Sequence, residues 1–223
     1  MIMSVLTEDH FMGHLEYLLI EQVIDLALAP KQTILWGFHC SKAIDLWGTY
    51  ASVHNQTYLL GSPLSQPPSE SVWPNEQVDL CVIANANQLA QENGRWLDNI
   101  WDHLKPGGLL MMHAWGGDSV IAWPELMMPR WAIEDIVSAL STHGWHQPQV
   151  MSHRIAWEIA SATTASRELT LAGIAHRPYQ NELSWPQTWL CDILQARVWR
   201  KSQQQLTNKK DHVVQITDIK VRH

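Results

Sequence analysis

The stretch WLDNIWDHLKPGGLLMMHA, residues 96–114, constrains the fold of this chain more than any other segment. Its first half places apolar side chains on one face of a helix: Trp96, Leu97, Ile100, Trp101 and Leu104. The Pro-Gly-Gly segment that follows ends the helix, and both glycines are expected to supply the positive φ of a tight reversal. The apolar run Leu109–Met112 then predicts a strand covered on both faces. Together with the similar run 78–85, the pattern predicts two parallel strands joined by a right-handed helical crossover.

Apolar periodicity predicts the remaining elements along the chain. Helices are expected at 14–29, 41–51, 94–104, 132–142 and 186–205. Strands are expected at 33–37, 57–60, 78–84, 109–114, 154–161 and 168–175, with a last strand or ordered tail at 213–221. The segments 154–161 and 168–175 are expected to pair as an antiparallel hairpin. Residues 61–77 contain four prolines and cannot be helical.

The order strand, helix, Leu-Lys-Pro-Gly-Gly, strand resembles the C-terminal half of class I S-adenosylmethionine-dependent methyltransferases. The chain is most similar to the malonyl-acyl-carrier-protein O-methyltransferases of biotin synthesis. That family has a short aromatic-Gly-x-Asp segment after the turn, where this chain has Trp115-Gly116-Gly117-Asp118. A helix and a Gly-aromatic-x-x-Pro segment follow, within 133–150 here. The resemblance covers roughly residues 30–176.

The resemblance implies an α/β fold with a Rossmann-like sheet, mostly parallel, that ends in an antiparallel hairpin. Because the proline-rich segment 61–77 leaves no room for another crossover helix, we expect one strand-helix unit to be lost. Either TYLL (57–60) is the second strand and the third is lost, or it is the third strand and the second is lost. The expected organisation is an N-terminal helical segment (1–30), a methyltransferase-like domain (31–177), and a C-terminal helix with a basic tail (178–223).

The cofactor site that the resemblance implies lies at the carboxyl ends of the strands, and its motifs are degenerate here. The family has an acidic residue followed by Gly-x-Gly-x-Gly after strand one, an acid after strand two, and a polar or acidic residue after strand three. This chain has Trp36-Gly37-Phe38 in the first place and Ser62 shortly after the second strand, with no acid. The residues that remain for cofactor contact are Trp36, Gly37, Phe38, Ser62 and Asn85.

No side chain identifies a catalytic group. Methyl transfer depends chiefly on placing the nucleophile near the sulfonium methyl, so few acid–base residues are required. Asp118 matches the family's Gly-x-Asp position, although an N-cap role explains it as well. Arg130 and Arg154 are the arginines near enough in the chain to grip a substrate carboxylate. The twelve histidines form no cluster with metal-ligand spacing, so no metal site is predicted.

Composition limits the compartment and the partners. The formal net charge is −7, but residues 178–223 hold seven Lys and Arg against four Asp and Glu, which leaves −10 on residues 1–177. An acidic body argues against broad nucleic-acid binding, whereas the basic tail could contact an acidic partner such as an acyl carrier protein or RNA. The three cysteines are widely spaced and give no disulfide framework. No apolar run reaches the roughly 18 residues of a membrane span. A cytoplasmic protein is therefore predicted.

Thirteen tryptophans against two phenylalanines can be explained by core packing or by an exposed binding surface.

Two functions remain open. The first is a methyltransferase-like protein without catalysis, or with a remodelled cofactor site, that binds or regulates a protein partner or forms a homo-oligomer. The second is an active S-adenosylmethionine-dependent methyltransferase, acting on a carboxyl group of a carrier-bound thioester.

Overall fold

The computed structural model describes residues 11–51, 55–60, 73–87, 95–117, 119, 131–142, 145–171 and 186–201. Its helices are α1 (Phe11–Asp25), α2 (Ser41–Tyr50), α3 (Arg95–His103), α4 (Ile133–Thr142) and α5 (Ala162–Leu171). Its strands are β1 (Gln32–Trp36), β2 (Gln56–Leu60), β3 (Val78–Ile83), β4 (Leu104–Trp115), β5 (His146–Ile159) and β6 (Gln187–Trp199). None of the described helices has the length and apolar character needed to cross a membrane.

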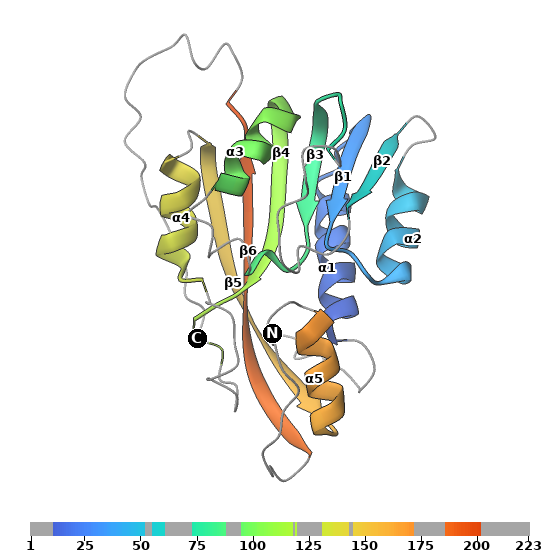
Figure 1. Cartoon of the computed structure of the whole chain (residues 1–223), viewed down its shortest axis with the longest axis vertical. Helices are drawn as coiled ribbons and strands as arrows, with labels where there is room; N and C mark the ends of the chain where they lie inside the picture. Colours follow the sequence, from blue (N-terminus) through green and yellow to red (C-terminus); the bar gives the residue numbers. More distant parts are fainter. Residues whose placement is uncertain are drawn as a thin grey trace.

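The six described strands form one sheet in the order β2-β1-β3-β4-β6-β5 (Figure 1). Strands β2, β1, β3 and β4 are mutually parallel, and β6 runs antiparallel to both β4 and β5. This architecture confirms the expected Rossmann-like sheet with a C-terminal antiparallel hairpin. Because β2 pairs directly with β1, it takes the place of the second strand in a doubly wound sheet. Of the strands described, β2 is the outermost at this edge.

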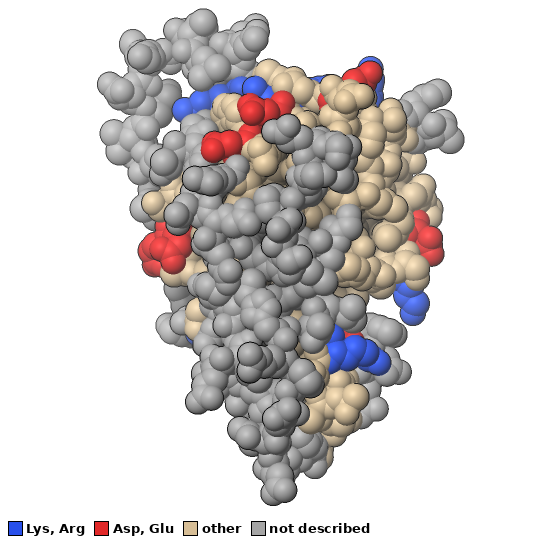
Figure 2. All heavy atoms as spheres, in the orientation of Figure 1, with Lys and Arg blue, Asp and Glu red and all other residues tan. Residues whose placement is uncertain are grey.

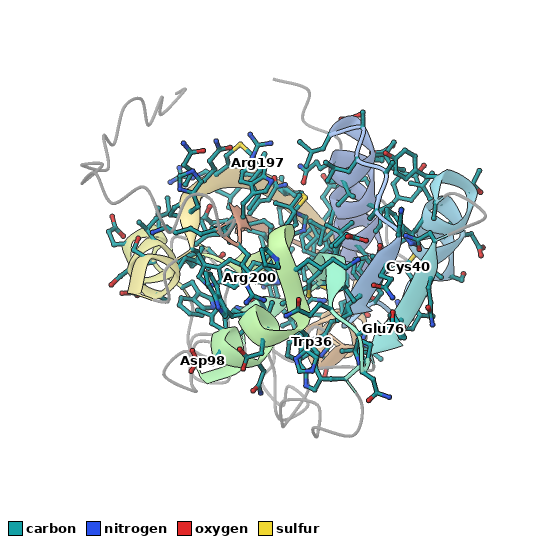
Figure 3. The ribbon with its side chains drawn as sticks, turned by 90° about the horizontal axis from the view of Figure 1, so that it is seen from above. Trp36, Cys40, Glu76, Asp98, Arg197 and Arg200 are labelled. Atoms are coloured by element: carbon teal, nitrogen blue, oxygen red, sulfur yellow. The ribbon has the colours of Figure 1, made fainter. Side chains whose placement is uncertain are left out.

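The sheet is covered on both faces, and the alternation of side chains along each strand divides the core in two. On β1, Ile34 and Trp36 join a cluster with residues of α3 and α4. Leu35 points to the other face and packs with residues of α1 and α2. Seen from above, α3 and α1 lie on opposite sides of the sheet (Figure 3). A third cluster joins the start of α1 to α5 and the far ends of β5 and β6.

Core packing accounts for most of the tryptophans. Of the eleven that the structure describes, nine are buried: Trp36, Trp47, Trp73, Trp96, Trp115, Trp131, Trp145, Trp157 and Trp189. Trp101 and Trp199 are half-buried, and the remaining two lie outside the described residues. The expectation of an exposed tryptophan surface therefore finds no support in the described part of the chain.

The C-terminal hairpin is built from different segments than the sequence predicted. The partner of β5 is β6, which was expected to be helical, and the expected partner at 168–175 begins within helix α5. Ser161 starts that helix, since its Oγ accepts a hydrogen bond from the Thr164 N–H at 3.2 Å. The apolar spacing of β6 also fits a helix, and its insertion between β4 and β5 decides the outcome. The strand or tail predicted at 213–221 lies outside the described residues.

The Lys-Pro-Gly-Gly segment is part of strand β4, whereas the sequence predicted a separate turn before it. The register between β3 and β4 slips here, from Val78 opposite Leu104 to Leu80 opposite Leu109. Gly107 has the expected positive φ, at 83°. Gly108 does not, and its role is spatial, because a Cβ there would lie 2.8 Å from Cγ of Leu104. The two glycines therefore serve different purposes.

Gly48 gives a direct test of the helix α2. A Cβ added at Gly48 would have no described atom within 4 Å, apart from the backbone of the helix itself and the two chain neighbours. The φ of Gly48 is not positive, so alanine can adopt the same backbone. Because alanine loses less backbone entropy than glycine in a helix, Gly48→Ala should stabilise the protein by about 0.5–1 kcal/mol. Urea denaturation of the two proteins measures this difference. A destabilised variant would contradict the helix as placed.

The charged side chains of the described residues are spread over the face seen in Figure 2. Acidic and basic groups lie close together along its upper edge, and neither sign gathers into one patch on the described part of this face. Mixed charges of this kind make weak fields at a distance.

Candidate functional site

The carboxyl ends of β1, β3 and β4 lie next to one another, because these strands are adjacent and parallel. In open α/β sheets, ligands bind in the crevice outside these ends. Three loops start there: Gly37–Cys40 after β1, Ala84–Asn87 after β3, and Gly116–Gly117 after β4. The candidate site is therefore the loop cluster at this edge.

The first loop is tied to its neighbours on both sides. Gly37 has φ 77° and donates its N–H to the carbonyl of Leu60 at 3.2 Å. The carbonyl of Trp36 accepts from the N–H of Ala84 at 2.9 Å. These bonds connect the predicted Trp36-Gly37 corner to the ends of β2 and β3. The left-handed φ explains why glycine stands at position 37.

The side chains on either side of Gly37 point to opposite faces of the sheet. Trp36 is fully buried and lies on the α3 side, where its ring meets Trp73 edge-on at 5.8 Å (Figure 3). Phe38 is only 8% exposed and packs with α1 and α2. Both side chains are thus parts of the core. The Nε1 of Trp36 is buried without a hydrogen-bond partner among the described residues.

A carboxylate from α1 occupies the backbone donors of this loop. Glu16 is 2% exposed, and its Oε2 accepts from the N–H groups of His39 at 2.8 Å and Cys40 at 2.7 Å. These donors lie just before the first turn of α2, where the helix dipole favours negative charge. Glu16 therefore fills the anion position that the loop and the helix create.

Burial raises the pKa of Glu16 to about 7. The hydrogen bonds from Cys40 and His39 oppose this shift, and the nearby Glu168 adds to it. Glu168 is also buried, and its carboxylate accepts from the N–H of Met12 at 3.2 Å and pairs with Arg167 at 3.0 Å. Two buried carboxylates thus anchor α1, one to the loop after β1 and the other to α5.

The loop after β3 is held to the end of β4 by the side-chain amide of Asn87. The backbone of Asn85 has φ 60°, and its side chain is 5% exposed. Asn87 is fully buried, and its Oδ1 accepts from the N–H of Trp115 at 2.7 Å. The Nδ2 of Asn87 has no hydrogen-bond partner in the part of the chain that the structure describes. The indole N–H of Trp131 donates to the carbonyl of Ala86 at 3.2 Å, which closes this loop from the α4 side.

The loop after β4 is closed by β6. The N–H of Gly116 donates to the carbonyl of Asp192 at 2.7 Å, and the N–H of Asp192 donates to Oγ of Ser119 at 2.9 Å. Ser152 of β5 donates to the Asp192 carboxylate. Asp192 is 5% exposed. This buried carboxylate is therefore part of the structural joint between β4, β5 and β6.

The structure brings four of the predicted cofactor residues to one edge: Trp36, Gly37, Phe38 and Asn85. Ser62, Asp118 and Arg130 lie outside the described residues. Arg154 lies on β5, in register with Asp192.

Sequence reasoning missed Glu16 and Asp192. A signal for Glu16 existed, because it falls at helical spacing among the buried residues of α1, where a charged side chain is unexpected.

Comparisons with known proteins agree on the fold. No protein-family model matches the chain, and no curated protein matches its sequence. A protein assigned as a methyltransferase from Bacillus halodurans aligns with a TM-score of 0.51 and 10% identity, over 82% of this chain and 99% of the other. The YcgJ protein of Bacillus subtilis aligns with a TM-score of 0.52 and 11% identity, over 82% of this chain and 98% of the other.

A third similar structure is a phosphoethanolamine N-methyltransferase 2 from Haemonchus contortus, solved with S-adenosylhomocysteine. It aligns with a TM-score of 0.52 and 8% identity, over 84% of this chain and 53% of the other. Identities this low establish the fold alone. The chain therefore has the class I methyltransferase fold.

Proposed function

We propose that this protein is a non-catalytic member of the methyltransferase fold, whose own side chains fill the ordinary cofactor place. It acts instead by binding or regulating a partner. The observation that carries this proposal is the Glu16 carboxylate on the His39 and Cys40 amides.

A ligand that used these amides would have to displace Glu16. The carboxyl group would then remain buried without its two hydrogen bonds, which costs about 1–3 kcal/mol for a neutral group and more for the ionised form. S-Adenosylmethionine itself carries a carboxylate, so it would compete for the same donors while adding a like charge. The loop thus opposes the ligand electrostatically.

The side chains of the loop oppose it sterically as well. The resembled family leaves glycines after strand one, and a bare backbone admits a ligand at close range. Here Phe38 is packed into the core between α1 and α2, and Trp36 fills the α3 side. Moving either ring would leave a cavity, which is costly in a close-packed core. These residues do not fit S-adenosylmethionine in its ordinary mode.

One observation favours the second function, an active methyltransferase with a rebuilt site. The Nδ2 of Asn87 and the Nε1 of Trp36 are buried donors without acceptors among the described residues, and both belong to the ligand-binding edge. Unsatisfied buried donors are unusual, and a bound ligand that offers acceptors would satisfy them. The substrate would then be a carboxyl group on an acyl-carrier-protein thioester, as the resemblance suggests.

Calorimetric titration with S-adenosylmethionine and S-adenosylhomocysteine separates the two functions. We expect no saturable binding with either ligand at millimolar concentration, because Glu16 and Phe38 occupy the position that the cofactor would take at the loop after β1. A micromolar dissociation constant would contradict the non-catalytic proposal and support the second function. Methyl transfer to an acyl-carrier-protein thioester would then be assayed directly.

The variant Glu16→Ala sharpens this experiment, because it frees the two loop amides. Measurable binding by this variant, with none by the natural chain, would identify the carboxylate as the group that excludes the ligand. Glu21→Ala is the matched control, since it removes an exposed carboxylate from the same helix. A titration with acyl carrier protein alone tests whether that protein is the partner.

A further inference from the structure

Among the described strands, β5 forms a free edge of the sheet. It is 14 residues long, and of the described residues only those of β6 pair with it. The outward N–H and C=O groups of such a strand form a template for pairing with another chain. Pro148 has no N–H, so it limits any added pairing to the part of β5 that follows it.

This later part of β5 stands apart from the parallel strands. In Figure 1 the far ends of β5 and β6 extend beyond the ends of β1, β3 and β4. Helix α4 covers the earlier part, since Val150 packs against the cluster that contains Ile136 and Leu140. Side chains further along, at Arg154 and Glu158, are exposed.

The residues around Ala156 are self-complementary. Arg154, Ala156 and Glu158 alternate along the strand and therefore point to the same face. When two copies of β5 pair antiparallel about a two-fold axis at Ala156, position 154 of one copy lies opposite position 158 of the other. Each Arg154 then faces Glu158 of the second copy, and the pair occurs twice. Opposite charges directly across two strands attract, whereas like charges repel.

The centre of this surface is apolar. Leu190 of β6 lies in register with Ala156 and is 49% exposed. It is one of three large hydrophobic side chains that are exposed among the described residues. Two-fold pairing at Ala156 brings both copies of Ala156 together, with Leu190 on either side and the charged pairs outside. An apolar centre with a polar rim is the usual anatomy of a specific interface.

We propose that the partner of this edge is a second copy of the chain, paired through β5 about a two-fold axis at Ala156. The two sheets join into one continuous sheet across the axis. A two-fold interface uses the same surface on both subunits, which the Arg154–Glu158 complementarity satisfies. This inference goes beyond the proposed function and does not depend on whether a cofactor is bound.

Light scattering after size-exclusion chromatography tests the proposal with the full chain. We expect a mass of twice the 25.5 kDa of one chain at micromolar concentration. Glu158→Arg places arginine opposite arginine at both pairs, so self-association should weaken at least about tenfold. The double variant Arg154→Glu with Glu158→Arg restores opposite charges and should restore the dimer. Circular dichroism of each variant verifies that the fold is kept.

Glu134→Arg is the matched control, because it makes the same charge change at an exposed position of α4. It should leave the dimer unchanged. A natural chain that stays monomeric at high concentration would overturn the proposal. So would a dimer that tolerates Glu158→Arg, because its interface would then lie elsewhere.

Ala156→Cys tests the axis itself, in a background with Cys40→Ser that removes the half-buried native thiol. Directly opposed residues in an antiparallel pair lie about 4.5–5.5 Å apart between Cα atoms, which a disulfide can span. Mild oxidation should link most chains into dimers. The same experiment with Thr188→Cys, which lies one strand further from the axis, should give far less cross-linked dimer. Equal cross-linking by both variants would contradict an axis at Ala156.

Discussion

Replacing Gly116 by alanine should destabilise the protein by about 3 kcal/mol, the largest effect we expect from a single methyl group. A Cβ at this position would lie 2.7 Å from Cγ of Asp192 and 3.1 Å from Cγ of Leu194. Asp192 cannot withdraw freely, because it is buried and bonded to Ser119 and Ser152. The Gly116 N–H bond to the Asp192 carbonyl would be strained as well.

Urea denaturation measures the change, and the melting temperature should fall by roughly 6–12 °C for a chain of this size. Gly117→Ala is the control, since the nearest described atom to its Cβ is the carbonyl oxygen of Trp131 at 3.9 Å. It should change stability by less than about 0.5 kcal/mol. Equal effects at the two positions would show that β6 does not press against Gly116.

Replacing Glu16 by glutamine should stabilise the protein at pH 8 by roughly 2–3 kcal/mol and leave its stability nearly unchanged at pH 4.5. Burial raises the pKa of Glu16 from 4.5 to about 7, so the folded protein favours the neutral carboxyl group. Between these two values the folded state binds more protons than the unfolded state. The stability of the natural chain therefore falls as pH rises from about 4.5 to 7, and the full penalty applies above 7.

Glutamine keeps an oxygen that accepts from the His39 and Cys40 amides but cannot ionise. The measurement is chemical denaturation of both proteins at several pH values. Burial, with a smaller effect of His153, also lowers the pKa of His113 to about 3, which makes stability fall below pH 6.5. His113 is present in both proteins, so its contribution cancels in the difference between their free energies of unfolding. A difference that is flat with pH would contradict a buried, raised Glu16.

The strands β1, β3 and the later part of β4 were predictable because each is a short, continuous apolar run. Runs such as 78–83 and 109–112 are buried on both faces, and few structures other than a parallel sheet accommodate that pattern. The loop at Trp36–Phe38 was also informative, because Trp36 stands where the resembled family has a polar or acidic residue and Phe38 carries a side chain where that family leaves room. The structure places both in the core.

The sequence by itself determined where the apolar strands β1, β3 and the later part of β4 lie along the chain, and where the helices α2, α3 and α4 lie. Local periodicity decides these features, because the spacing of apolar residues within each strand and helix predicts which of its faces is buried. Tertiary structure alone decided that 187–199 is a strand, since its apolar spacing fits either element and β4 and β5 supply the pairing. It also decided that Glu16 meets the loop after β1, because a contact over 23 residues depends on how α1 docks on the sheet.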